Sequence, residues 1–156
     1  MTAVWRGLQY CHQQEVVHRD VKPEIVLMSG YDSIKQADFR MSTNLKPKTF
    51  CGIIGYLAPE ILTGQSYTSS VNIYASGIMF HEMIHGDIDQ FINCSLDDKS
   101  SKSSYQPPKT ISKDLGDLLQ NLTAASAKKL PTALEIGERC RRRSNRLGIP
   151  NIGEDM

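Results

Sequence analysis

The stretch His18-Arg19-Asp20-Val21-Lys22-Pro23-Glu24 decides how this sequence folds. Two shorter motifs follow it along the chain, first Asp38-Phe39-Arg40 and then Ala58-Pro59-Glu60. A single tripeptide of this kind occurs by chance in unrelated proteins and carries little weight alone. Three motifs in a fixed order and at a fixed spacing are far more specific than any one of them.

The composition is that of a globular protein with one domain. The chain has 156 residues, of which 40% are hydrophobic and 22% charged, enough for a single hydrophobic core. Its net charge of +1 provides no field that would favour nucleic acid or a membrane surface as a partner. No apolar run approaches the ~18 residues that a membrane-spanning helix needs.

The cysteines and one basic segment bear on location. The four cysteines are scattered, without the Cys-x-x-Cys pair that would indicate zinc or redox chemistry. They predict reduced thiols in an intracellular protein, cytoplasmic by default. The basic segment Arg139–Arg146 leaves a nuclear location open, although a solvated helix end explains it as well.

The hydrophobic periodicity predicts a mainly helical domain. The helix expected over residues 69–85 is apolar on most sides, Met79 and Met83 included, which predicts a buried position. Two short strands, 25–28 and 33–37, are expected to pair as a hairpin. The other expected helices cover residues 2–13, a short segment from Ala58, residues 113–123, and a final helix that begins with Pro131.

The three motifs resemble the catalytic loop, the metal-binding turn and the end of the activation segment of a eukaryotic protein kinase of the Ser/Thr type. The resemblance implies a mainly α member of an α+β fold family, namely the large lobe with a small hairpin near the catalytic loop. The small lobe is expected to be absent, because no Gly-rich loop precedes the motifs. Residues 1–147 are expected to form this partial domain, with a mobile insertion at about 94–109, and residues 148–156 a tail.

The resemblance assigns the chemistry of phosphoryl transfer to three residues. Asp20 would accept or orient the proton of the substrate hydroxyl, and Lys22 would lie near the transferring phosphate. Asp38 would hold Mg²⁺, so that Asp38 and Lys22 together would bind the cofactors, Mg²⁺ and ATP.

The resemblance also implies structural and regulatory roles. His18 and Phe39 would stack into the hydrophobic column that links the two lobes. Arg19 would pair with a phosphate on the activation loop, and Thr49 matches a position that is phosphorylated in some kinases. An ordinary exposed loop threonine is the plainer interpretation of Thr49.

Two departures from the family pattern affect the metal site. Ile25 stands where the family has a metal-binding Asn, and its side chain offers no oxygen to Mg²⁺. Arg40 stands where the family has Gly, and its guanidinium can pair with Asp38 through two hydrogen bonds and occupy the place of the metal.

Three further departures concern residues that would hold the catalytic residues and Glu60 in position. Ile53 replaces a Thr whose hydroxyl would bridge Asp20 and Lys22. Asn72 replaces an Asp that accepts backbone hydrogen bonds from the catalytic loop, and Asn can keep part of that role. Leu130 replaces an Arg that would pair with Glu60, and Lys129 could substitute for it.

These features predict a catalytically impaired pseudokinase fragment that acts by binding a protein, inactive on its own. The alternative is an active Ser/Thr protein kinase, either as part of a longer product or with a partner that supplies the small lobe. Two other interpretations stay open, a non-enzymatic competitor for the partners of a true kinase and a gene relic that barely folds. A protein partner or protein substrate is expected in each functional case, without nucleic acid or membrane.

Overall fold

The computed structural model is mostly helical, with one small two-stranded sheet in the part of the chain that it describes. It describes residues 2–29, 33–44, 47–89, 92, 107–124 and 126–146. The elements are α1 (Thr2–Gln13), β1 (Val26–Ser29), β2 (Ser33–Gln36), α2 (Pro59–Leu62), α3 (Ser70–His85), α5 (Lys113–Leu122) and α6 (Ala133–Arg146), with single-turn 3-10 helices η1 (Pro23–Ile25), η2 (Phe39–Met41) and η3 (Ala127–Lys129). The prediction of a mainly helical domain with a small hairpin is confirmed.

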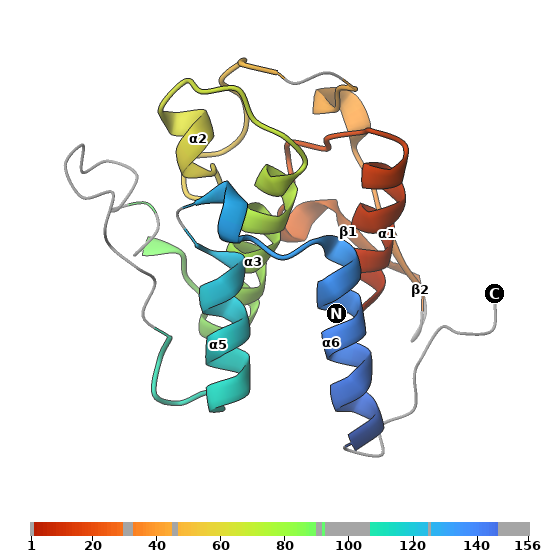
Figure 1. The fold of residues 1–156 in the computed structure, drawn as a ribbon, viewed down its shortest axis with the longest axis vertical. Helices are drawn as coiled ribbons and strands as arrows, with labels where there is room; N and C mark the ends of the chain where they lie inside the picture. Colours follow the sequence, from red (N-terminus) through yellow and green to blue (C-terminus); the bar gives the residue numbers. More distant parts are fainter. Residues whose placement is uncertain are drawn as a thin grey trace.

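Helix α3 lies at the centre, and α1, α5 and α6 pack around it (Figure 1). Its residues 71–73 and 75–81 are all buried, as the apolar composition predicts. The core joins Trp5 and Leu8 of α1 to Ile78 of α3, Leu119 of α5 and Ile136 of α6. Helix α5 packs directly against α3, whereas α6 packs chiefly against α1 and completes the same core.

The last turn of α3 differs from the prediction. Met83 was expected in the core, but its side chain is 64% exposed. The reason is that α3 runs past the end of the core before Gly86, in the left-handed conformation with φ of 83°, ends it. The N–H of Gly86 donates to the carbonyl of Glu82 at 2.7 Å, which satisfies a carbonyl at the helix end.

The hairpin forms, with its first strand shifted by one residue from the expected 25–28 to Val26–Ser29. Strands β1 and β2 are antiparallel, with Val26 opposite Gln36 and Met28 opposite Ile34. Ile25 was expected in the strand but closes η1, whose first residue is Pro23. The turn between the strands, residues 30–32, lies outside the described residues.

Helix α6 begins two residues later than its proline suggests. The expectation was that Pro131 would be its first residue, but Thr132 is the cap and Ala133 the first helical residue. The Thr132 hydroxyl accepts the N–H of Glu135 at 3.2 Å, and the Glu135 carboxylate accepts the N–H of Thr132 at 2.7 Å. This reciprocal pair is a capping box, which satisfies two otherwise unpaired donors.

The expected insertion and tail fall mostly outside the described residues. Of residues 94–109, the structure describes Pro107, Pro108 and Lys109, and it describes none of 148–156. The helix expected over 113–123 is confirmed as α5. Among the residues described, no helix combines the length and the hydropathy needed to cross a membrane.

A Gly77→Ala variant should destabilise the fold by about 1–3 kcal/mol, because α3 and α5 are in closest contact at Gly77. A Cβ at position 77 would lie 2.6 Å from the Cβ of Leu122, so one helix would have to move. Gly137→Ala on α6 is the matched control: no heavy atom lies within 4 Å, and the gain in helix propensity should stabilise by about 1 kcal/mol. Urea denaturation measures both, and two shifts of the same sign would contradict the prediction.

Candidate active site

The candidate catalytic residues Asp20 and Lys22 form an ion pair. The Lys22 ammonium lies 2.9 Å from the Asp20 carboxylate, and both side chains are largely buried, 18% and 14% exposed. Lys22 directly precedes Pro23, which opens η1 and fixes the direction of the chain at this point. The structure thus brings together the two residues to which the resemblance assigns the chemistry.

His18 connects the catalytic loop to the Asp38 turn. Its Nδ1 accepts the N–H of Asp20 at 3.4 Å, which assigns the proton to Nε2, and Nε2–H donates to the carbonyl of Ala37 at 3.0 Å. The ring is fully buried and contacts Phe39 edge-on, with ring centroids 4.7 Å apart. The column expected to link the two lobes stays a prediction, and His18 fixes the backbone of the two candidate acids Asp20 and Asp38.

Asp38 is paired with Arg40 through two hydrogen bonds. Arg40 Nε donates to Oδ1 at 2.7 Å and a terminal guanidinium nitrogen donates to Oδ2 at 2.5 Å. Arg40 lowers the pKa of Asp38 to about 2, mainly through this side-chain hydrogen bond. The pairing expected from the sequence is confirmed.

The candidate acids and cations lie close enough to act on each other electrostatically. After Arg40, the charge of Lys22 also lowers the pKa of Asp38, and the charge of Asp20 contributes after Asp38 to raising the pKa of Arg40. Asp38 adopts the left-handed conformation with φ of 60°, and Arg19 does so with φ of 69°. This conformation destabilises a non-glycine residue by about 1–3 kcal/mol, and it is found where the surrounding structure holds a functional site in place.

The donor set does not fit a Mg²⁺ ion. Both carboxylate oxygens of Asp38 are engaged by Arg40, and Ile25 supplies a buried hydrocarbon where a second oxygen ligand would be required. Within the described residues, no group of three or more His, Cys, Asp or Glu side chains is placed to hold a metal. In the structure, the Arg40 guanidinium therefore occupies the carboxylate on which the expected metal site depends.

Asn72 keeps the contact that the replaced Asp would make. Its Oδ1 accepts the backbone N–H of Arg19 at 3.0 Å, so the expectation that Asn retains part of the role is confirmed. This contact orients the amide, and its Nδ2 faces His12 Nε2 at 3.2 Å. Because Nδ2 is a donor, His12 Nε2 must be an unprotonated acceptor, and burial lowers the pKa of His12 to about 4.

The stability of the fold should decline as the pH falls from about 6.5 to about 4. Folded His12 stays neutral in this window while the unfolded chain binds a proton there, so acidification favours unfolding. The loss should reach about 2 kcal/mol, since His12 is partly exposed. Urea denaturation across this pH range tests it beside His12→Gln, which keeps an acceptor but does not titrate. Burial also lowers the pKa of His81, an effect present in both proteins, so equal slopes would rule out His12.

Arg19 and Thr49 meet through Tyr67. The Tyr67 hydroxyl donates to the carbonyl of Thr49 at 2.9 Å and lies within hydrogen-bonding reach of Arg19. Arg19 Nε also donates to the carbonyl of Met41, and the Thr49 side chain is exposed. The regulatory role of Arg19 and Thr49 stays a prediction, and the structure adds that both residues contact Tyr67.

Ile53 is 47% exposed beside Asp20, and both line a cavity of about 10 Å³, room for about one water. The apolar side chain of Ile53 cannot bridge Asp20 and Lys22 as a threonine hydroxyl would. The two residues instead contact each other directly.

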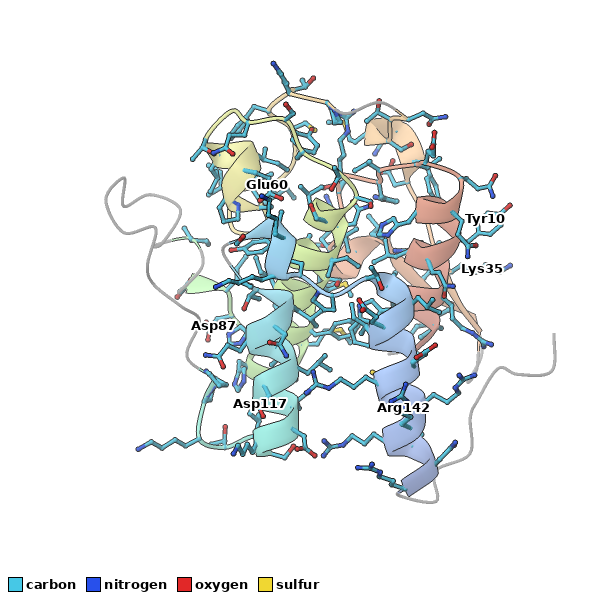
Figure 2. The ribbon with its side chains drawn as sticks, in the orientation of Figure 1. Tyr10, Lys35, Glu60, Asp87, Asp117 and Arg142 are labelled. Atoms are coloured by element: carbon cyan, nitrogen blue, oxygen red, sulfur yellow. The ribbon has the colours of Figure 1, made fainter. Side chains whose placement is uncertain are left out.

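Glu60 is half-buried, and Ser70 donates to its carboxylate at 3.3 Å (Figure 2). In the described part of the chain no ion pair includes Glu60, and Lys129 is exposed instead of replacing the missing Arg.

Sequence reasoning missed three supporting contacts, namely the His12–Asn72 pair, the Tyr67 anchor and the hydrogen bonds of His18. The first two join residues far apart in the chain, so no local pattern predicts them. The third could have been suspected from the position of His18 two residues before Asp20.

Comparison with known proteins agrees with this geometry. A model of the protein kinase domain matches residues 1–139. Aurora kinase B of Danio rerio is 33% identical over 127 residues, which are 78% of this chain and 40% of that protein. Aurora kinase B of Drosophila melanogaster is 33% identical over 145 residues, 85% of this chain and 42% of that protein. Sperm motility kinase Z of Mus musculus is 33% identical over 138 residues, 83% of this chain and 28% of that protein.

The chain spans less than half the length of each of these relatives. The family model nevertheless covers nearly the whole chain, including the three motifs from which the site is built. The chain therefore belongs to the eukaryotic Ser/Thr protein kinase family, and it covers a part of the kinase domain.

Proposed function

We propose that this chain is the large lobe of a Ser/Thr protein kinase domain in which its own residues block phosphoryl transfer, and that it acts by binding a protein. The observation that carries the proposal is the Arg40 guanidinium on both oxygens of Asp38. Phosphoryl transfer depends on placing cations against the phosphates, and in this family Mg²⁺ ions supply much of that charge. A carboxylate already engaged by a tethered cation is a poor ligand for the ion.

The substitution of Ile25 for the metal-binding Asn adds to the effect of Arg40 on Asp38. Ile25 is 3% exposed, so its side chain fills the apolar interior. Water therefore cannot take its place as an oxygen ligand. A metal at Asp38 would lack this ligand even if Arg40 moved away. The remaining machinery, Asp20 with Lys22, would hold its geometry without a positioned phosphate to act on.

With nucleotide binding impaired, a protein partner is the ligand that we propose for this chain. We also propose that the chain is located inside the cell, in the cytoplasm. The basic segment that left the nucleus open is partly neutralised, since Arg142 pairs with Glu138 at 3.1 Å and Arg143 with Asp114 at 2.6 Å.

One observation favours the alternative of an active kinase. Asp20 and Lys22 are paired, and His18 fixes Asp20 relative to the Asp38 turn, an arrangement that a protein without catalysis does not need. In this case the chain would act as part of a longer product, or a partner would supply the small lobe, ATP and Mg²⁺ being the cofactors.

Calorimetric titration of the protein with Mg²⁺-ATP, beside an Asp38→Ala variant, tests the proposal. We expect no heat that depends on Asp38, with circular dichroism showing that both proteins are folded. Binding that vanishes in Asp38→Ala would refute the closed site and favour the active kinase, to be followed by an assay of phosphate transfer. A melting curve without a cooperative transition would instead support the gene relic.

A further inference from the structure

The last turns of α3 read His-Glu-Met-Ile-His over residues 81–85, a His-Glu-x-x-His pattern. Residues four apart on a helix lie on the same face, and two histidines at this spacing can bind one zinc ion. The pattern is short enough to occur by chance, so the surrounding structure decides what it means. His81 comes nine residues after Asn72, which places the pattern about 14 Å along α3 from the candidate active site.

The two imidazole rings of the pattern are in contact. The ring centroids of His81 and His85 lie 4.5 Å apart, and the ring planes are tilted by 34°. Nε2 of His85 is buried and has no hydrogen-bond partner in the described part of the chain. A buried ring nitrogen without a partner is unfavourable, and its lone pair can be satisfied by a donor or by a metal ion. The pair therefore offers two nitrogen-bearing rings side by side, one of them with an unused nitrogen.

The charges around the pair favour a cation. His85 is the last residue of α3 before its Gly86 cap, and the C-terminal end of a helix carries partial negative charge. Asp87, labelled in Figure 2, adds a carboxylate two residues later. Burial and then the charge of His85 lower the pKa of His81, while the charge of Asp87 raises it, so Asp87 acts on the pair electrostatically. An imidazole with a lowered pKa is unprotonated at pH 7, which is the form that binds metals.

Glu82 separates this pattern from that of a zinc hydrolase. In those enzymes the glutamate of the pattern is the general base that activates a metal-bound water. Here the Glu82 carboxylate accepts a hydrogen bond from the Tyr56 hydroxyl, so it is already engaged within the fold. Among the residues that the structure describes, no third His, Cys, Asp or Glu side chain joins the pair. The arrangement therefore fits metal binding by two imidazoles and not hydrolysis.

We propose that His81 and His85 bind one Zn²⁺ ion at the C-terminal end of α3, with water in the remaining coordination positions. Imidazole is a ligand that Zn²⁺ prefers, whereas Mg²⁺ prefers oxygen ligands. Two protein ligands give a weaker site than the three or four of catalytic and structural zinc centres. Both ligands must stay on one helix face to hold the ion, so binding also stabilises the last turn of α3.

Proton NMR of the imidazole rings, assigned with His→Gln variants, tests the proposal during a titration with Zn²⁺ under reducing conditions. We expect Zn²⁺ to shift or broaden the ring signals of His81 and His85, and excess Mg²⁺ not to reverse the change. The ring signals of His12 and His18 should stay unchanged, because both rings are engaged within the fold. Zn²⁺ bound by thiols alone would leave all four rings unchanged and would overturn the proposal.

His85→Gln is the decisive variant, because His85 is half-buried at the helix end whereas His81 is 2% exposed in the core. Its Zn²⁺ affinity, measured by calorimetry, should fall about tenfold or more, since even residues that only support a metal ligand contribute about 10–100-fold. Met83→Ala, at a side chain 64% exposed on the same turn, should leave the affinity unchanged. Glu82→Gln, which keeps an acceptor for Tyr56, should also leave it unchanged.

Melting curves give a second measurement. Zn²⁺ should raise the melting temperature of the wild-type protein and of Met83→Ala, and it should not raise that of His85→Gln, because a ligand stabilises the state that binds it. Equal Zn²⁺ affinity in wild type and His85→Gln would overturn the proposal, since the ion would then bind elsewhere. A loss in Glu82→Gln as large as that in His85→Gln would also overturn it, because the site would then depend on the carboxylate.

Discussion

The double variant Ile25→Asn, Arg40→Ala should bind Mn²⁺ at Asp38, with an affinity at least tenfold above any Asp38-dependent binding by the wild-type protein. Removing the guanidinium frees both oxygens of Asp38, and the new Asn supplies the missing oxygen ligand. Arg40 is 85% exposed, so water screens its ion pair with Asp38, and the single variant Arg40→Ala should gain only a small part of this affinity. The second ligand accounts for the rest. Electron paramagnetic resonance of Mn²⁺ measures the bound fraction.

Arg40→Lys separates charge from geometry. Lysine keeps the positive charge but cannot bridge both oxygens, so its Mn²⁺ affinity should fall between wild type and Arg40→Ala. Alanine is chosen over glycine because Arg40 is not at positive φ, so glycine would add backbone freedom for no purpose. Asp38→Asn in the double variant should remove the gain. Mn²⁺ binding of equal strength in wild type would show that Arg40 does not close the site.

The folded state of the double variant needs its own check. Ile25 is 3% exposed, and an Asn in its place that finds no metal costs about 1–3 kcal/mol as a buried polar group. A melting curve should show this loss, and part of it should be recovered when Mn²⁺ is added, because a ligand stabilises the state that binds it. A destabilised protein with no recovery would mean that the introduced asparagine side chain does not reach the ion.

The predictions that succeeded from sequence rest on local geometry or on periodicity. Asp38 and Arg40 are two residues apart, so a bidentate contact follows once a turn is assumed. The buried position of α3 follows from its apolar composition, which leaves no side for solvent over ten of its residues. The motifs themselves predicted the proximity of Asp20 and Lys22.

The prediction for Met83 failed because it required knowledge of where the packed core ends, whereas the start of α6 could have been predicted from the sequence. Met83 continues the apolar pattern of α3 but lies beyond the partners that would cover it. Pro131 was taken as the first helical residue, although Thr132 and Glu135 form a capping box that the sequence shows three residues apart. The contact of His12 with Asn72 depends on the packing of α1 against α3, which no local pattern reveals.

Trp5→Ala should destabilise the fold by about 3–5 kcal/mol, a large part of the roughly 5–15 kcal/mol typical of a domain. Trp5 is 1% exposed, its Nε1–H donates to Ser76 Oγ at 3.2 Å, and its ring lies 4.6 Å from that of Phe80. Trp5→Phe should lose about 1–2 kcal/mol, because it keeps a ring and loses the donor. Urea denaturation followed by circular dichroism measures each change.

Tyr10→Ala is the matched control on the same helix. Tyr10 is 67% exposed on the outer side of α1 (Figure 2), so its loss should change stability by less than about 0.5 kcal/mol. Comparable losses in Trp5→Ala and Tyr10→Ala would mean that α1 is not packed on α3 as the structure has it. The effect of Trp5 should also extend to the candidate site. Helix α1 carries His12, and when α1 detaches, Asn72 loses the acceptor for its amide and the Arg19 backbone loses a fixed partner.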